Sequence, residues 1–380
     1  MHVLVVGAGA FGSWTARWLL RRRASVTLVD QYGAGNSLAS SGDESRVTRS
    51  AHGADMHYPV WQRRALEQWL ALDRSLFVPT GVVWLAHRED GFEADSLRAL
   101  ERLGIPAERL EADALRARLP QMRTDDVAWA LHEPEAGVLL ARRAVAATAR
   151  AGATDGGEAR IGLARVEGDA VLVDGEPATF DAVVFAAGPW LPKLLGPIPG
   201  LELSIPQQEV IYLATPPGDR RFEAGSIPTW VEYDAAFYGL PSIEGRGFKV
   251  APDWPGPEVD PDTQERRLSD ERIAATRAYL RRRLPDLAER PVAEGRVCQY
   301  ELTPDTHFIV DRHPSIPDAW IVGGGSGHGF KHGPVVGEYV SALVTGQDPG
   351  DLAPPDDRFA LQPRSPGAGM RTVAVAPIES

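Results

Sequence analysis

The chain has 380 residues, a length that allows two domains or one large α/β domain with an insertion. Hydrophobic residues make up 43% of it and charged residues 24%, which excludes a wholly disordered, collagenous or coiled-coil protein. The net charge of −12 disfavours nucleic acid as a partner, and no apolar stretch approaches the roughly 20 residues that a membrane-spanning helix needs. The one cysteine cannot form an internal disulfide, and the N-terminus carries no basic leader. We therefore expect a cytoplasmic protein without a nucleic-acid or membrane partner.

A glycine-rich turn follows the first predicted strand. Residues 3–6 form an unbroken aliphatic run that is typical of a buried parallel strand, and residues 13–23 carry apolar side chains at helical spacing. Between these segments, Gly7 allows a tight turn, Gly9 lets the backbone approach a pyrophosphate, and Gly12 lets the helix pack on the strand. A pyrophosphate at this turn would face the N-terminus of the helix, where backbone N–H groups favour negative charge.

The next segments complete a dinucleotide-binding pattern. Phe11 lies within the glycine turn, and a second strand over residues 26–29 ends at Asp30, whose carboxylate can accept hydrogen bonds from a ribose diol. An acid at this point disfavours a 2′-phosphate, which leaves NAD or FAD. Residues 33–49 are rich in glycine and serine, so we expect an extended loop where an NAD domain would continue with another βαβ unit.

Two later segments repeat the order of a strand and a glycine turn. Residues 181–190 form one such unit, and residues 319–331 form another, which precedes a predicted helix over residues 335–344. Three units spread over the whole chain indicate one nucleotide-binding domain that is interrupted by insertions, and this arrangement favours FAD over NAD. The candidate cofactor contacts in these later turns are Ala187, Gly188, Trp190, Gly325, Gly327, Gly329 and Phe330.

The intervening segments predict a second unit rich in strands. Aromatic and β-branched residues are frequent in four predicted strands, which cover residues 80–87, 127–132, 209–215 and 296–302. A helix is predicted over residues 269–284, where Pro285 ends it. The last residues are rich in proline and glycine without periodicity, and we expect a tail over residues 366–380.

Several motifs together make the chain resemble the FAD-dependent amine and amino-acid oxidases, a family typified by monomeric sarcosine oxidase, N-methyltryptophan oxidase and pipecolate oxidase. These motifs are the N-terminal fingerprint and residues 40–49, 238–241, 247–249, 298–300 and 326–331. The resemblance implies an α/β plus α+β fold, in which a Rossmann-like FAD-binding domain is interleaved with a substrate domain built on a large antiparallel or mixed sheet. It places the FAD domain at residues 1–79, 135–203 and 305–365, and the substrate domain at residues 80–134 and 204–304.

The resemblance also assigns roles to single residues around the cofactor. A cysteine at the position of Cys298 is bonded through sulfur to the flavin in the resembled subfamily, whereas an isolated buried cysteine is often an inert hydrophobic residue. Arg46 corresponds to an arginine beside the flavin, and Ser40 and Ser41 belong to the same motif. We count all four residues as candidate cofactor contacts.

Lysine is rare in this sequence, so each lysine is informative. Only Lys193, Lys249 and Lys331 occur among 40 basic residues, and chemistry that needs a compact ammonium group cannot use arginine instead. Lys193 lies in a proline-rich stretch and is expected to be incidental. The resemblance implies that Lys331 and Arg49 hold the carboxylate of the substrate, where Lys331 also contacts the cofactor. It implies that Lys249 promotes the reaction of the flavin with O₂, because a fixed cation stabilises superoxide.

Aromatic and histidine positions extend the candidate site, and other positions depart from the family pattern. Tyr238 and Tyr300 match aromatic pocket residues, and His328 matches a histidine near the flavin, although strand aromatics more often belong to a core. Close relatives have histidine and glycine at the positions of Gly42 and Asp43 here, histidine at that of Asp253, and another tyrosine at that of Phe237. We expect the cofactor to be kept and the preferred amine to differ.

These observations predict an FAD-dependent oxidase that converts an N-substituted glycine or a cyclic secondary amino acid to an imine and reduces O₂ to H₂O₂, with no metal ligands. The alternatives are a glycine- or D-amino-acid-oxidase-like enzyme acting on primary or bulky N-carboxymethyl amines, a flavin dehydrogenase, and a non-catalytic FAD-binding subunit. The expected partners are an amino acid or amine substrate and O₂, and the expected state is a monomer or a small homo-oligomer.

Overall fold

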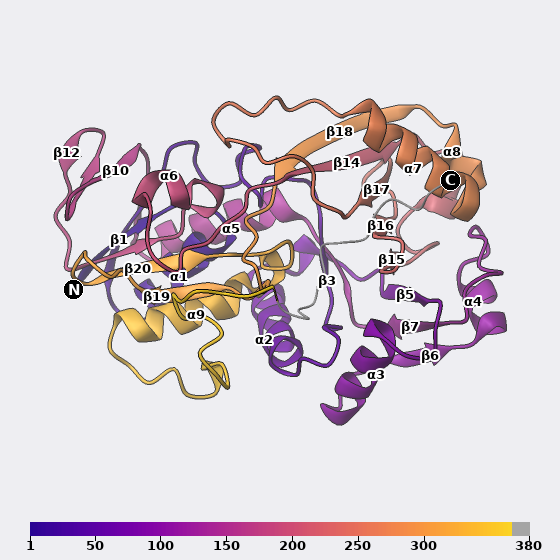
Figure 1. The fold of residues 1–380 in the computed structure, drawn as a ribbon, viewed down its shortest axis with the longest axis horizontal. Coiled ribbons are helices and arrows are strands. Elements are labelled where there is room, and N and C mark those ends of the chain that lie inside the picture. Colours follow the sequence, from indigo (N-terminus) through magenta and orange to yellow (C-terminus); the bar gives the residue numbers. More distant parts are fainter. Residues whose placement is uncertain (367–380) are drawn as a thin grey trace.

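The computed structural model describes residues 1–366, so all but the first residue of the predicted tail lies outside the described residues. Two large sheets account for most of the strands, and they lie at opposite ends of the molecule (Figure 1). Helix α2 (His57–Leu72) lies between the two ends in the same view. Among the described residues, no helix combines the length and the apolar character needed to cross a bilayer.

The first sheet has six strands in the order β19-β20-β13-β1-β2-β9, and every neighbouring pair is parallel except β19–β20. Its strands are β1 (His2–Val6), β2 (Ser25–Asp30), β9 (Glu158–Ile161), β13 (Ala182–Phe185), β19 (Ile309–Arg312) and β20 (Ala319–Gly323). Since β1, β13 and β20 are parallel neighbours, the three predicted glycine turns that follow them meet at one edge of the sheet. That edge is where ligands bind in sheets of this kind.

Both faces of this sheet are covered. On one face, α1 (Ala10–Arg21) packs against α9 (Gly333–Val344) and α5 (Ala141–Thr154), and apolar side chains of α1 and α9 share one core with those of the strands. On the other face lie the small antiparallel sheet β10-β11-β12 and helix α6 (Leu191–Leu195). The three strands of the small sheet are β10 (Ala164–Glu167), β11 (Ala170–Val173) and β12 (Glu176–Pro177).

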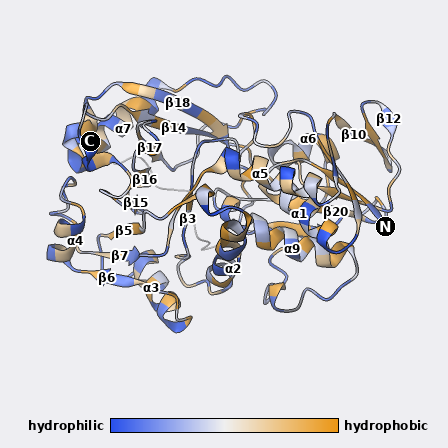
Figure 2. Cartoon of the chain, turned by 180° about the vertical axis from the view of Figure 1, so that it is seen from behind, coloured by the Kyte–Doolittle hydropathy of each residue, from blue (hydrophilic) through white to orange (hydrophobic). Residues whose placement is uncertain are grey.

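The second sheet has eight strands in the order β18-β14-β17-β16-β15-β5-β7-β6, and it is antiparallel except at the β15–β5 pair. Its strands are β5 (Val82–Ala86), β6 (Glu108–Leu110), β7 (Trp129–Glu133), β14 (Gln207–Leu213), β15 (Thr229–Glu232), β16 (Phe237–Leu240), β17 (Phe248–Pro252) and β18 (Val292–Gln299). Hydrophobic stretches follow the strands of both large sheets, whereas the connecting loops are mostly hydrophilic (Figure 2).

Short elements surround the second sheet and connect it to the first. Helices α4, α7 and α8 share a core with one side of the sheet, and α3 shares another with β5 and β7. These helices are α3 (Phe92–Arg102), α4 (Ala112–Arg118), α7 (Asp270–Arg283) and α8 (Pro285–Ala288). A third sheet joins β3 (Arg46–Thr48), β8 (Gly137–Leu139) and β4 (Phe77–Val78). The 3₁₀ helices are η1 (Arg74–Leu76), η2 (Gly188–Trp190), η3 (Arg220–Phe222), η4 (Phe330–His332) and η5 (Gly350–Leu352).

The predicted fold class, a Rossmann-like unit interleaved with a large mixed sheet, is confirmed. All strands of the parallel sheet come from the three segments expected to bind FAD, and those of the eight-stranded sheet come from the other two. The helix predicted over residues 269–284 is α7, whose Ser269 side chain accepts a hydrogen bond from the backbone N–H of Arg272. Pro285 ends this helix as predicted and also begins α8.

The contact between α1 and α9 predicts the effect of one added methyl group. A Cβ atom at Gly337 would lie 2.5 Å from the carbonyl carbon of Trp14 and 2.7 Å from the backbone nitrogen of Thr15. Gly337→Ala must therefore push two backbones apart, and we expect it to lower the free energy of unfolding by about 1–3 kcal/mol. Urea unfolding followed by tryptophan fluorescence measures this change.

Gly152→Ala in α5 is the matched control, because its nearest neighbour would be Leu20 Cδ1 at 3.7 Å. We expect this variant to be neutral or stabilised by up to about 1 kcal/mol, since alanine is the better helix former. Equal changes in the two variants would contradict the close packing of α1 on α9.

Candidate active site

The glycine turn after β1 is shaped by close backbone contacts. Gly7 has φ +103°, and a Cβ atom there would lie 2.3 Å from the carbonyl oxygen of Ala186. A Cβ atom at Gly12 would lie 1.8 Å from the carbonyl oxygen of Gly7. Neither position can hold a larger residue. Gly9 precedes α1, whose first turn has no side-chain cap, so its backbone N–H groups face the end of the sheet.

A cavity of about 650 Å³ opens at this edge of the parallel sheet. Its walls combine all three glycine turns with the loop after β2. The predicted cofactor contacts that line it are Gly7, Gly9, Phe11, Asp30, Ser40, Ser41, Arg46, Ala187, Gly188, Trp190, Gly325, Gly327, Gly329 and Phe330. The structure therefore gathers the predicted cofactor contacts from distant parts of the chain into one cavity.

Two acidic residues contribute to this cavity in different ways. The carboxylate of Asp30 accepts hydrogen bonds from the backbone N–H groups of Ala8 and Tyr32, both at 2.8 Å, so it holds the glycine turn in place. Its predicted hydrogen bonds to a ribose diol stay a prediction. Sequence reasoning missed Glu301, which also lines the cavity and whose Oε1 accepts a hydrogen bond from the backbone of Gly325 at 3.3 Å. Burial raises the pKa of Glu301 to about 7.

Cys298 lies on β18 close to the large cavity but does not line it. Its side chain is buried, and burial raises the pKa of its thiol, whereas the nearby positive charges of Arg46 and Lys249 act in the opposite direction. Tyr300, two residues further along the chain, does line the cavity. A covalent bond between Cys298 and the flavin stays a prediction.

A second, smaller chamber of about 80 Å³ adjoins the large cavity. The two share Arg46, Tyr300, Gly327 and Phe330 as lining residues. All six residues predicted to act on the substrate line this smaller chamber, namely Arg49, Tyr238, Lys249, Tyr300, His328 and Lys331. Aromatic side chains complete its wall, and they come from Trp84, Phe92 and Tyr233.

Charges of both signs line the smaller chamber. The guanidinium group of Arg49 donates a hydrogen bond to the carbonyl of Ala51 and lies 5.1 Å from the ring centre of Trp84. The ammonium group of Lys331 donates to the carbonyl of His328 at 3.1 Å, and its side chain is buried. Asp253 brings a carboxylate to the same chamber and accepts a hydrogen bond from the hydroxyl of Tyr300 at 3.0 Å.

Lys249 is also buried, and Asp43 is its ionic partner. Its Nζ lies 2.6 Å from Asp43 Oδ2 and donates a second hydrogen bond to the carbonyl of Ser45 at 2.9 Å. Arg46 Nη1 lies 2.5 Å from the same carboxylate oxygen. Sequence reasoning singled out Asp43 only as a departure from the family pattern, because nothing local links it to a strand two hundred residues away.

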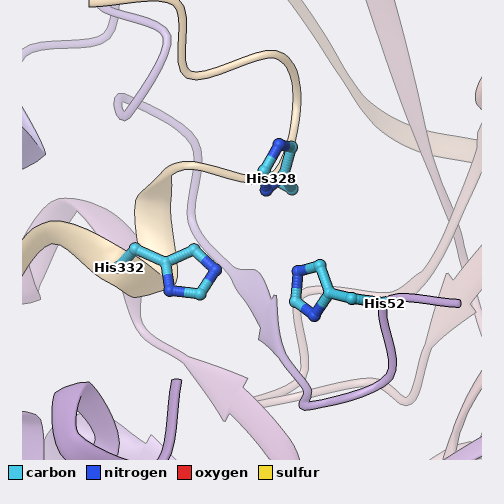
Figure 3. Close-up of side chains that lie close together, drawn as sticks. All are labelled: His52, His328 and His332. Atoms are coloured by element: carbon cyan, nitrogen blue, oxygen red, sulfur yellow. The ribbon is translucent and has the colours of Figure 1, made fainter. Parts of the chain in front are cut away.

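Sequence analysis also missed two histidines that meet His328. His52 and His332 are buried with it, and one nitrogen of each ring lies within 4.8 Å of the others (Figure 3). His52 Nδ1 donates to the carbonyl of Ser50 at 2.7 Å, and His328 Nε2 donates to the carbonyl of Thr306 at 2.9 Å. These bonds leave the other nitrogen of each ring as an acceptor, which is the tautomer that metal ligands need.

The charges around the three histidines oppose a metal cation. Burial lowers the pKa of both His52 and His332 well below the usual value, and the positive charges of Lys331 and Arg49 lower it further. The same two cations would repel a divalent ion, and no described carboxylate completes the group. The rings also stack into an aromatic cluster with Tyr58 and Phe308. We therefore interpret the cluster as a neutral wall beside Lys331.

Comparisons with known proteins support the same class of site. Residues 2–343 match the family described as FAD dependent oxidoreductase. The chain is 32% identical to the monomeric sarcosine oxidase of Streptomyces avermitilis over 358 residues, which cover 90% of this chain and 93% of that protein. It is also 32% identical to the peroxisomal sarcosine oxidase of Mus musculus, over 92% and 94% of the two chains. Fructosamine oxidase from Aspergillus fumigatus has the same fold, with a TM-score of 0.80 and 22% identity over 98% of this chain and 92% of that one.

The electrostatic argument predicts that the histidine cluster holds no transition metal. Protein purified without chelators is expected to carry fewer than about 0.1 equivalents of zinc, copper, nickel or iron per chain by plasma mass spectrometry. The variant His332→Phe, which removes one of the three rings, should leave that content unchanged. A stoichiometric metal that is lost in this variant would overturn our interpretation of the cluster.

Proposed function

The chain belongs to the family of FAD-dependent oxidoreductases, and we propose that it oxidises the C–N bond of a small secondary amino acid. The substrate class is an N-substituted glycine or a cyclic secondary amino acid, the electron acceptor is O₂, and the products are an imine and H₂O₂. FAD supplies the chemistry, because it accepts a hydride equivalent from the substrate and passes two electrons to O₂. The imine then reacts with water to give a carbonyl compound and an amine.

The observation that carries this proposal is the position and charge of the small chamber. It adjoins the cavity lined by the cofactor residues, and both Arg49 and Lys331 reach it from segments far apart in the chain. Two cations of different geometry can clamp one carboxylate, with the arginine bonding in bidentate fashion. A clamp of this kind fixes the neighbouring carbon atom against the cofactor and contributes through positioning.

The opposite charge in the chamber fits the amine of the same substrate. Asp253 lines the chamber, and Tyr300 donates a hydrogen bond to its carboxylate. An amino acid carries an ammonium group next to its carboxylate, so a chamber with both charges is complementary to it. Asp253 can hold the ammonium group on entry, and the amine must then lose a proton before the C–H bond is broken. The volume of about 80 Å³ favours a small substituent on nitrogen.

The names of similar proteins point in the same direction. Sarcosine oxidases are about as long as this chain and match it over almost their whole length. We also assign the segments 1–79, 135–203 and 305–365 to the FAD domain and 80–134 and 204–304 to the substrate domain. In this division, Arg49 and Lys331 come from the FAD domain, whereas Tyr238, Lys249 and Asp253 come from the other.

Anaerobic mixing with candidate amines tests the proposed substrate class. We expect small N-substituted glycines or cyclic secondary amino acids to bleach the flavin absorbance. Lys331→Met should weaken their binding by about 2–5 kcal/mol, because the substrate carboxylate loses the buried ammonium group of Lys331 as a partner. Amines without a carboxylate should bind to the variant and to the parent with the same affinity. Stopped-flow absorbance gives the dissociation constants.

Lys193→Met is the matched control, since Lys193 is exposed, pairs with Asp260 and Asp262, and lines the large cavity but not the small chamber. It should bind the same amino acids as the parent does. The proposed substrate class is wrong if none of these amino acids bleaches the flavin. It is also wrong if Lys331→Met weakens the binding of carboxylate-free amines as much as it weakens the binding of the amino acids.

The predicted bond between Cys298 and the flavin is tested by acid precipitation. We expect the yellow colour of the parent protein to stay with the pellet, and that of Cys298→Ser to move to the supernatant, because a hydroxyl group does not replace the thiolate as nucleophile. The colour is read by absorbance of both fractions. Colour released from the parent protein would show that FAD is held without a covalent bond.

A further inference from the structure

The ion pair between Lys249 and Asp43 is buried and is surrounded by polar side chains. The exposed fraction is 1% for Lys249 and 3% for Asp43. Asp43 Oδ2 accepts hydrogen bonds from Lys249 at 2.6 Å and from Arg46 at 2.5 Å. Asp43 Oδ1 accepts from the Tyr212 hydroxyl at 3.0 Å and from the backbone N–H of Glu44 at 2.7 Å. Both oxygens of this carboxylate are therefore fixed in place.

One buried carboxylate thus serves two cations, of which Lys249 is buried and Arg46 is partly buried. Burial on its own would raise the pKa of Asp43, but Lys249 and Arg46 more than reverse this shift and hold its pKa well below the usual range. For Lys249, the surrounding groups favour the charged form less strongly. Burial lowers the pKa of its ammonium group, Asp43 opposes that shift, and Arg46 adds to it. Without the carboxylate, burial and the guanidinium charge would act together to remove the proton.

Among the described residues, no other group around Lys249 is placed to take over the role of Asp43. Glu44 and Glu244 line a small cavity together with Lys249, but both already pair with arginines. The other titratable groups that face Lys249 belong to Tyr212 on β14, Tyr238 on β16, Cys298 on β18, and Arg46. Burial raises the pKa of all three acidic groups among them, the two phenols and the thiol, so they are neutral near pH 7. Asp253, which follows β17, lines the chamber where it accepts a hydrogen bond from Tyr300.

We propose that Asp43 is a positioning residue that keeps Lys249 protonated and aims its ammonium group at the chamber where O₂ is reduced. The proposal rests on the proposed function, in which Lys249 stabilises the negative charge that forms on O₂. Asp43 itself is separated from the chamber, since it does not line either cavity. It acts through Lys249.

The experiment measures the reaction with O₂ apart from the oxidation of the amine. Protein with bound FAD is reduced with dithionite, mixed with O₂ in a stopped-flow instrument and followed by flavin absorbance between pH 6 and 9. In Asp43→Asn, we expect the rate constant for oxidation of the reduced flavin by O₂ to fall about 10- to 100-fold at pH 8. The same rate constant should rise again toward pH 6. The reason is that a buried lysine without a partner has a pKa of about 5–6. The parent should change by less than about threefold over this range.

Three further variants separate charge from structure. Tyr212→Phe removes one hydrogen bond from Asp43 but keeps both charges, so its rate constant should stay within about twofold of the parent. Asp43→Glu keeps a carboxylate and should restore most of the rate at pH 8. Lys249→Met should be slow at every pH, and adding Asp43→Asn to it should change nothing more, because the two substitutions act through one group.

Sulfite supplies a second reading that does not depend on turnover. Its affinity for oxidised flavin, measured by bleaching, increases with positive charge beside the ring. In Asp43→Asn, the affinity for sulfite should be weaker than in the parent at pH 8 and should recover toward pH 6. A rate constant or a sulfite affinity that rises in Asp43→Asn would overturn the proposal, because it would show that Asp43 suppresses the charge of Lys249. Equal losses at every pH, or equal losses in Tyr212→Phe, would show a purely structural role and would also overturn it.

The two proposals can fail separately. Dithionite reduction needs no amine, so a wrong substrate class leaves this experiment unaffected. A parent protein whose reduced flavin reacts no faster than free flavin would refute O₂ as the acceptor, and the sulfite titration would still test whether Asp43 holds the proton on Lys249.

Discussion

The buried ion pair between Asp43 and Lys249 joins the two large sheets. Asp43 belongs to the loop that follows β2 of the parallel sheet, whereas Lys249 and Tyr212 belong to neighbouring strands of the eight-stranded sheet. An ion that loses its partner in such a place costs several kcal/mol. The loop over residues 33–49 therefore cannot move independently of the second sheet. Because it continues directly into β3, the same contacts fix the side chain of Arg46 between the two cavities.

The glycine turns position the cofactor cavity against this junction. The turns after β1, β13 and β20 lie at one edge because these strands are parallel neighbours, and the close approach of Gly7 to Ala186 holds two of them together. Tyr300, which immediately follows β18 of the other sheet, lines both cavities. The smaller chamber is thus enclosed by side chains from both sheets, and neither sheet alone would form it.

The parts of this structure that the sequence predicted are those with local signals. A strand, a glycine turn and a helix follow one another within residues 3–23, and the interrupted pattern of such units was enough to predict an inserted second domain. The contact between Asp43 and Lys249 joins positions 206 residues apart and has no local signal. The same holds for His52 and His332, which meet only because η4 packs against the chain after β3. Cys298 differs from these residues, because a local motif predicted its role. The strand that carries it nevertheless places its side chain just outside the cavity.

Burial and charge distinguish the three lysines of this chain. Lys193, which was expected to be incidental, is exposed and pairs with Asp260 and Asp262, a role that arginine could also fill. Lys249 and Lys331 are almost wholly buried, and both line the small chamber.

Together with two arginines, these lysines give the chamber four cations against the carboxylates of Asp43 and Asp253. His52 and His332, which lie beside Lys331, add no charge, because burial and the neighbouring cations lower the pKa of both well below the usual value. The side chains that line the chamber therefore carry an excess of positive charge. In the proposed function, a substrate carboxylate would neutralise part of this excess on binding, and the reduction of the cofactor and of O₂ would place further negative charge within its reach. On that proposal, substrate binding and electron transfer depend on the same buried cations, and each of them must keep its proton and its position.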